Sequence, residues 1–142
     1  MSDNVYLGNP NLKKANTPIE FTEEQVIEFL KCKEDPVYFA NNYIKIVSLD
    51  EGLTQFHPYH FQEKLINNFH ENRFNICKMP RQTGKSTTVV SYLLHYAVFN
   101  DSVNIGILAN KAATARELLG RLQTAYENLP KWMQQGIISW NK

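Results

Sequence analysis

The chain has 142 residues, of which 43% are hydrophobic, and a formal net charge of +1. This length fits one domain with a hydrophobic core, and the near-neutral charge excludes a protein that is basic over its whole surface. A local contact surface for DNA stays open. The longest apolar run, around residues 89–99, is interrupted by Ser91 and His95 and is too short to span a bilayer.

The first part of the chain predicts a loose arm followed by helices. Residues 1–18 are polar, with scattered Asn, Lys, Gly and Pro, and predict a flexible N-terminal arm. Thr22 and Gln25 are spaced as a capping box, and Asp35 before Pro36 is a second helix-start signal. Residues 44–47 alternate between apolar and polar, which fits an edge strand or the end of the second helix. We therefore assign residues 19–56 to a small helical subdomain.

Residues 57–142 predict the first part of an α/β domain. A helix opens at Pro58, and an apolar segment at 74–79 reads as a buried parallel strand. Helical spacing follows over residues 86–99, then a turn at 100–102 and a second apolar strand at 103–109. Strand, helix and strand in this order form a βαβ unit. The predicted fold class is α/β, a P-loop-type parallel sheet with flanking helices, incomplete in this chain.

A last helix is expected over residues 112–128, with its leucines packed into the core. The two cysteines, Cys32 and Cys77, are far apart in the sequence, which favours reduced thiols over a disulfide. Cys77 lies in the predicted first strand, so we expect its thiol to be buried.

The segment between the first strand and its helix carries the chemistry. Residues 79–86 read Met-Pro-Arg-Gln-Thr-Gly-Lys-Ser, a phosphate-binding P-loop. Gly84 lets the backbone approach phosphates, and the amides that follow open a helix whose positive end faces them. Lys85 supplies a charge for the β- and γ-phosphates of ATP, and the Ser86 hydroxyl offers one coordination position to Mg²⁺. The predicted nucleotide-binding residues are Gln62, Arg81, Gln82, Thr83, Gly84, Lys85, Ser86 and Thr87.

Two residues depart from the common P-loop pattern. Met79 stands where the first glycine is usual, and Pro80 removes one amide donor from the loop. The alternative reading is that residues 84–86 are only the first turn of a helix and bind no ligand. The setting between a strand and a helix favours the phosphate loop.

Other polar residues have two readings each. The Gln62 amide can donate to and accept from an adenine base, or lie in solvent on a helix. Arg81 can reach the γ-phosphate and act as a catalytic residue with Lys85, or pair with a surface carboxylate. Lys111 can touch a DNA phosphate or simply be exposed. His57 and His60 have no further ligands nearby in the sequence, so a metal site there is not expected.

Together, residues 80–86, the preceding Phe61 and Gln62, and residues 106–111 resemble the large terminase subunit of tailed bacteriophages. The similarity runs from about Phe21 to Lys142 and is closest to the myovirus DNA-packaging motors. Those motors carry Arg-Gln-x-Gly-Lys-Ser/Thr in place of a glycine-first loop, which accounts for Met79 and Pro80.

The resemblance implies an ATPase that drives double-stranded DNA into a capsid and also carries a nuclease domain. It implies that Arg81 is a cis arginine finger and that Gln62 contributes to adenine recognition. ATP and Mg²⁺ are the implied cofactors, with Lys85 and Ser86 as their ligands. The implied partners are DNA, the capsid portal protein and the small terminase subunit, with no membrane. The implied location is the cytoplasm of an infected bacterium, transiently on the procapsid.

One part of a working ATPase is not predicted by this sequence. A P-loop ATPase needs an acidic residue at the end of a second hydrophobic strand, the Walker B strand. After Ser86 the only acidic residues are Asp101, Glu117 and Glu127, and none ends such a strand. We therefore expect the chain to stop before the acidic strand and to be incompetent for hydrolysis alone. A helicase-like, nucleic-acid-dependent ATPase and a non-catalytic remnant are the alternative functions.

Overall fold

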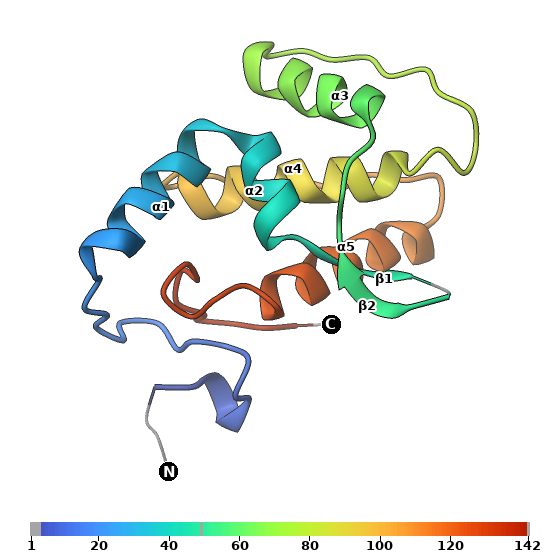
Figure 1. The fold of residues 1–142 in the computed structure, drawn as a ribbon. Coiled ribbons are helices and arrows are strands. Elements are labelled where there is room, and N and C mark those ends of the chain that lie inside the picture. The colour runs from blue at the N-terminus through green and yellow to red at the C-terminus, as the bar shows by residue number, and fades with distance from the viewer. Residues whose placement is uncertain (1–3, 49, 142) are drawn as a thin grey trace.

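The computed structural model describes residues 4–48 and 50–141 and contains both helices and strands. A short 3-10 turn, η1 (Tyr6–Gly8), precedes helices α1 (Glu23–Glu34) and α2 (Pro36–Tyr43). A hairpin of β1 (Lys45–Ser48) and β2 (Gly52–Gln55) leads to helix α3 (His60–Glu71). Helices α4 (Lys85–Phe99) and α5 (Ala112–Glu127) follow, and Figure 1 shows them joined by long connections rather than by strands.

Helices α1 and α2 start where their capping residues predict. The Thr22 hydroxyl accepts from the Gln25 amide at 3.2 Å, and the Gln25 side chain accepts from the Thr22 amide at 3.1 Å. The Asp35 carboxylate accepts from two amides of the first turn of α2, each at 2.9 Å, with Pro36 at the first helical position. The predicted capping box and the second helix start are both confirmed.

The hairpin settles the alternative for residues 44–47 in favour of a strand. β1 pairs with β2 in antiparallel register, with Lys45 opposite Gln55 and Ser48 opposite Gly52. Gly52 has φ +70°, a left-handed conformation that glycine adopts without cost. The segment predicted as an N-terminal subdomain thus contains two helices and a hairpin.

The core is a set of helices packed around α4, which contacts α2, α3 and α5. At its centre the rings of Phe39, His95 and Phe99 meet, with centroids 4.8–5.5 Å apart. Such tilted and edge-to-face contacts are the preferred arrangements of aromatic rings. This aromatic cluster joins α2 to the carboxyl-terminal half of α4.

The N-terminal arm lies against the C-terminal segment instead of standing alone. Leu12 is buried, and the Ala15 amide donates to the Ile137 carbonyl at 3.0 Å. The Gln134 side chain accepts from the Lys13 amide at 2.9 Å. Residues 4–18, expected as a loose arm, therefore have defined partners near the other end of the chain.

The two predicted parallel strands are not seen in the described residues, so that part of the fold prediction is not confirmed. Segments 74–79 and 103–109 are unpaired, and the only sheet of the described chain is the β1–β2 hairpin. A strand needs a neighbouring strand to bond its amides and carbonyls. Neither segment lies against such a neighbour among the described residues. For the same reason Cys77 is exposed and not buried as expected. Cys32 and Cys77 are both free thiols, as predicted.

Candidate phosphate-binding loop

The loop before α4 makes a turn with two residues in the left-handed backbone region. Gln82 and Gly84 both have left-handed backbone conformations, with φ +60° and +72°. Gly84 is the N-cap of α4, and Lys85 is its first residue. A non-glycine residue at positive φ is uncommon and concentrates at functional sites. The predicted Gly-Lys-Ser segment is therefore a helix start with a strained turn before it.

The loop is closed by the side chain of Lys85. Its Nζ donates to the Met79 carbonyl at 2.7 Å and to the Pro80 carbonyl at 3.1 Å. The Thr83 hydroxyl also donates to the Pro80 carbonyl, at 3.0 Å. These bonds fold the loop over the first turn of α4 and hold the ammonium group inside it. Pro80, which donates no amide, serves here as an acceptor.

The start of α4 leaves its amides free for an anion. No side chain of the described residues caps this helix, and its first turn contains no acidic residue. Among the described residues the amides of Lys85, Ser86 and Thr87 have no hydrogen-bond acceptor, and the Ser86 side chain is exposed. Free amides at a helix start carry partial positive charge and bind phosphate groups well. The residues present thus fit the phosphates of a nucleotide.

Gln62 connects α3 to this loop and is not solvated on a helix surface. Its side chain is only 3% exposed. The Oε1 atom accepts from the Tyr59 amide at 2.8 Å, and the Nε2 atom donates to the Thr83 carbonyl at 3.1 Å. Both ends of the amide are therefore held by backbone groups, and Gln62 fixes the position of the loop relative to α3.

An aromatic pair beside Gln62 was not singled out from the sequence. The rings of Tyr59 and Phe61 stack, with centroids 5.9 Å apart and planes 11° from parallel, and both side chains are exposed. The sequence did contain a sign of this pair, because two aromatic residues flank His60 at the start of α3. Exposed stacked rings next to a phosphate loop offer a flat surface to a planar base.

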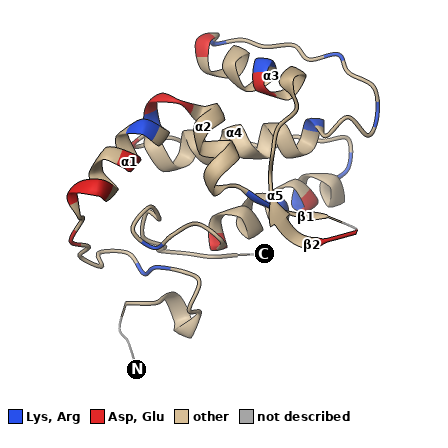
Figure 2. Ribbon diagram, in the orientation of Figure 1, with Lys and Arg blue, Asp and Glu red and all other residues tan. Residues whose placement is uncertain are grey.

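The remaining predicted residues are accessible but scattered. Arg81 and Gln82 are exposed, and no described carboxylate pairs with Arg81. Lys111 is exposed just before α5. Figure 2 shows basic residues along the connection from α3 to α4 and at the starts of α4 and α5. His57 is exposed, and His60 lies 3.6 Å from the Glu63 carboxylate, an ordinary neighbour on the same helix.

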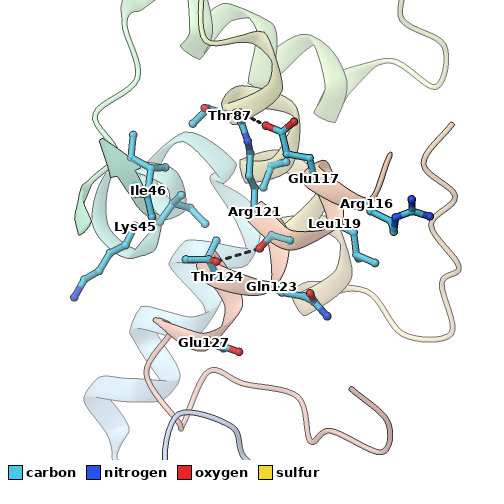
Figure 3. Close-up of a pocket in the computed structure, with 15 residues that line it drawn as sticks. Lys45, Ile46, Thr87, Arg116, Glu117, Leu119, Arg121, Gln123, Thr124 and Glu127 are labelled. Carbon is cyan, nitrogen blue, oxygen red and sulfur yellow. Dashed lines mark hydrogen bonds and ion pairs between the residues drawn. The ribbon is translucent and has the colours of Figure 1, made fainter. Parts of the chain in front are cut away.

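A separate cavity of about 750 Å³ lies between β1, α4 and α5 (Figure 3). Of the residues predicted to bind a nucleotide, only Thr87 lines it. Its lining carries charges of both signs, with Lys45, Arg116 and Arg121 against Glu117 and Glu127, and Glu117 lies 2.6 Å from the Arg121 guanidinium. The cavity thus borders the first turn of α4 and is distinct from the loop.

Within residues 4–48 and 50–141, no group of three or more His, Cys, Asp or Glu side chains is arranged to hold a metal ion. No helix in that part of the chain is long and apolar enough to cross a membrane. No known protein-family profile matches the chain.

Proposed function

We propose that this chain is the nucleotide-binding portion of a DNA-packaging ATPase, the large terminase subunit of tailed bacteriophages. In this proposal the loop at 79–86 binds the phosphates of ATP, with Mg²⁺ held partly by the Ser86 hydroxyl. The main support is the uncapped start of α4, where the amides of Lys85, Ser86 and Thr87 have no acceptor among the described residues, together with the Lys85 ammonium group in the loop before it.

The neighbouring residues support a nucleoside triphosphate over a simple anion. The exposed pair of Tyr59 and Phe61 is suited to stack on a base, and Gln62 ties this pair to the loop through Thr83. Arg81 is exposed and unpaired among the described residues, so its guanidinium is free to meet a γ-phosphate. The parent motor would move double-stranded DNA and would bind the portal protein and the small terminase subunit.

Hydrolysis by the chain alone is not expected. Asp101 follows the far end of α4, about 20 Å from Ser86 along a helix of this length. Glu117 is held by Arg121, and Glu127 ends α5. None of these three residues ends a strand beside the loop, as the acidic residue of a P-loop ATPase does. In the complete motor this role would fall to an acidic residue on a further strand.

The test is ATP binding measured by calorimetry for the wild-type chain, Lys85→Ala and Lys64→Ala, with and without Mg²⁺. Lys64 is an exposed lysine on α3 and serves as the matched control. Because a hydrogen bond to a charged group contributes about 1.5–3 kcal/mol, Lys85→Ala should weaken binding by roughly 10- to 100-fold. Equal affinity of all three proteins would refute the assignment of the loop.

Turnover is measured in the same samples as phosphate release. We expect none above background. Turnover that depends on Lys85 would contradict this expectation, and Glu117→Gln would then test whether the carboxylate that shares the cavity with Thr87 takes part.

A further inference from the structure

The surroundings of the Gln62 amide do not fit the reading of an adenine base. Its Oε1 atom accepts from the Tyr59 amide at 2.8 Å, and its Nε2 atom donates to the Thr83 carbonyl at 3.1 Å. An amide that reads adenine must present its donor and its acceptor side by side to the edge of the base. Here the chain's own backbone occupies both ends of the amide.

The remaining bonding positions of this amide are covered by the protein. Nε2 has a second N–H and Oε1 a second lone pair, but the Gln62 side chain is only 3% exposed. A Cβ added to Gly84 would meet Nε2 closely, so the Gly84 backbone lies against one side of the amide. A base that turned the amide toward itself would leave the Tyr59 amide or the Thr83 carbonyl without its partner, which costs as much as the new bond contributes. Base reading by Gln62 therefore gains little.

The surface that a base can reach beside the loop is the aromatic pair of Tyr59 and Phe61. These residues are 71% and 45% exposed, and their rings stack with planes 11° from parallel. The Tyr59 amide bonds to Gln62, which bonds to Thr83, so the pair is linked to the loop through one side chain. Stacking on an aromatic ring tolerates any base, because every base has a flat π face.

The polar side chains around this pair and in the loop are solvated. His57 is exposed, and the His60 side chain is 79% exposed and lies 3.6 Å from the Glu63 carboxylate. Arg81 and Gln82 are exposed as well. In open water a hydrogen bond to the edge of a base replaces one to water and contributes little net free energy. These groups therefore discriminate weakly between bases.

We infer that this site binds nucleoside triphosphates irrespective of the base, with the base stacked on Tyr59 and the phosphates held on the loop. The inference rests on the proposed function, because Lys85 and the start of α4 still bind the phosphates. It differs from the role that the resemblance implies for Gln62. Here Gln62 is a positioning residue, which fixes the loop relative to the aromatic pair and does not touch the base.

The test compares ATP, GTP, ITP and inorganic tripolyphosphate, each with Mg²⁺, by calorimetry on the whole chain. In guanine and hypoxanthine an oxygen stands where adenine carries its amino group, so an amide aligned on adenine rejects both. A bidentate contact of this kind discriminates roughly 5- to 150-fold between bases. We expect instead that the dissociation constants of the three nucleotides lie within about threefold of one another, and that all three bind more tightly than tripolyphosphate.

Two variants separate stacking from positioning. Tyr59→Ala removes the exposed ring and should weaken the nucleotides by roughly 5- to 100-fold, while tripolyphosphate retains its wild-type affinity. Phe74→Ala removes a ring that is 82% exposed elsewhere on the surface, and as the matched control it should leave all affinities unchanged. Gln62→Met removes both amide bonds and should weaken the three nucleotides by the same factor, so that their relative affinities do not change. Circular dichroism checks that each variant retains its helix content.

The outcomes separate this inference from the proposed function. ATP binding that depends on Lys85 and is about tenfold or more tighter than the binding of GTP and ITP would overturn the inference and leave the loop assignment intact. The same holds for equal affinities of tripolyphosphate and the nucleotides, or for a Gln62→Met variant that loses affinity for ATP alone. No binding of any nucleotide, or binding that is unchanged in Lys85→Ala, would refute the loop and the inference with it.

Discussion

The Gln62 side chain donates from Nε2 to the carbonyl of Thr83 at 3.1 Å, across 21 residues of sequence. This bond joins the first turn of α3 to the candidate phosphate loop. The Oε1 atom of the same Gln62 side chain accepts from the Tyr59 backbone amide at 2.8 Å, which fixes its orientation. Among the described residues, the bond to Thr83 is the only hydrogen bond between the loop and α3. The position of the predicted binding residues therefore depends on one buried amide.

Gln62→Glu should test that attachment. The new side chain retains an acceptor for the Tyr59 amide but places an oxygen against the Thr83 carbonyl. An unmade bond of a buried polar group costs about 1–3 kcal/mol, so we expect a loss of that size in the free energy of unfolding, measured with urea. Lys64→Ala, on the same helix but exposed, should change it by less than about 0.5 kcal/mol. An equal effect of both changes would mean that the bond does not form in solution.

Gly84→Ala should damage the loop where the same change at Gly120 should not. A Cβ on Gly84 would meet Gln62 Nε2 closely, and the backbone there has φ +72°. The left-handed conformation alone costs a non-glycine residue about 1–2 kcal/mol. Gly120 lies in α5 with no heavy atom within 4 Å of an added Cβ, so alanine should stabilise the chain there by about 0.5–1 kcal/mol. Thermal unfolding of the two variants should move in opposite directions, and shifts of the same sign would contradict this account.

The structure shows which parts of the fold can be read from local sequence. The capping box at Thr22 and the Asp35–Pro36 start of α2 are made by residues two to three positions apart, so sequence alone predicts them. The predicted helix at 86–99 begins one residue earlier, at Lys85, and ends at Phe99 as expected.

The strands predicted at 74–79 and 103–109 are not confirmed, because strand formation depends on pairing with a neighbour and not on local sequence alone. The apolar character of Ile76 and Leu108 is real, but pairing needs a neighbour that these residues do not contact. For Gln62, the structure shows contacts that the sequence could not predict. Its burial and its bond to Thr83 arise from the packing of α3 on α4, which no spacing along the chain reveals.

The pH dependence of stability should reflect His95. Burial, and to a smaller degree the charge of His70, lower the pKa of His95 from 6.5 to about 4, although the bond of Nε2 to the Cys32 carbonyl at 2.9 Å opposes this. The unfolded chain takes up a proton near pH 6.5 and the folded chain does not. Stability should therefore be fully present above pH 6.5 and fall as the pH drops toward 4. At about 1.4 kcal/mol per pKa unit, the loss approaches roughly 3 kcal/mol.

Urea unfolding at several pH values isolates this contribution. His95→Gln retains a donor for the Cys32 carbonyl but does not titrate, so its stability should fall less between pH 6.5 and 4 than that of the wild type. His57→Gln changes an exposed histidine and should keep the wild-type dependence. If His95→Gln kept the full wild-type slope, the loss of stability would have to come from other groups.

Gln134 should hold the N-terminal arm in place. Its Nε2 donates to the carbonyls of Asn11 at 2.9 Å, Leu129 at 3.1 Å and Tyr126 at 3.3 Å, and its Oε1 accepts from the Lys13 amide at 2.9 Å. The side chain is buried, so removing it leaves several backbone groups without partners. Gln134→Ala should therefore lower the free energy of unfolding by about 2–4 kcal/mol.

The arm itself gives a second readout of this change. Trypsin should cleave after Lys13 and Lys14 faster in Gln134→Ala than in the wild type, because the Lys13 amide loses its acceptor and the arm detaches more often. Lys131→Ala, an exposed change in the same segment, should leave both stability and cleavage at the arm near their wild-type values. If Gln134→Ala lowered stability without faster cleavage at the arm, Gln134 would support only the turn between α5 and the C-terminal segment. The expected result, faster cleavage at the arm together with a lower free energy of unfolding, would establish that the two ends of the chain fold as one unit.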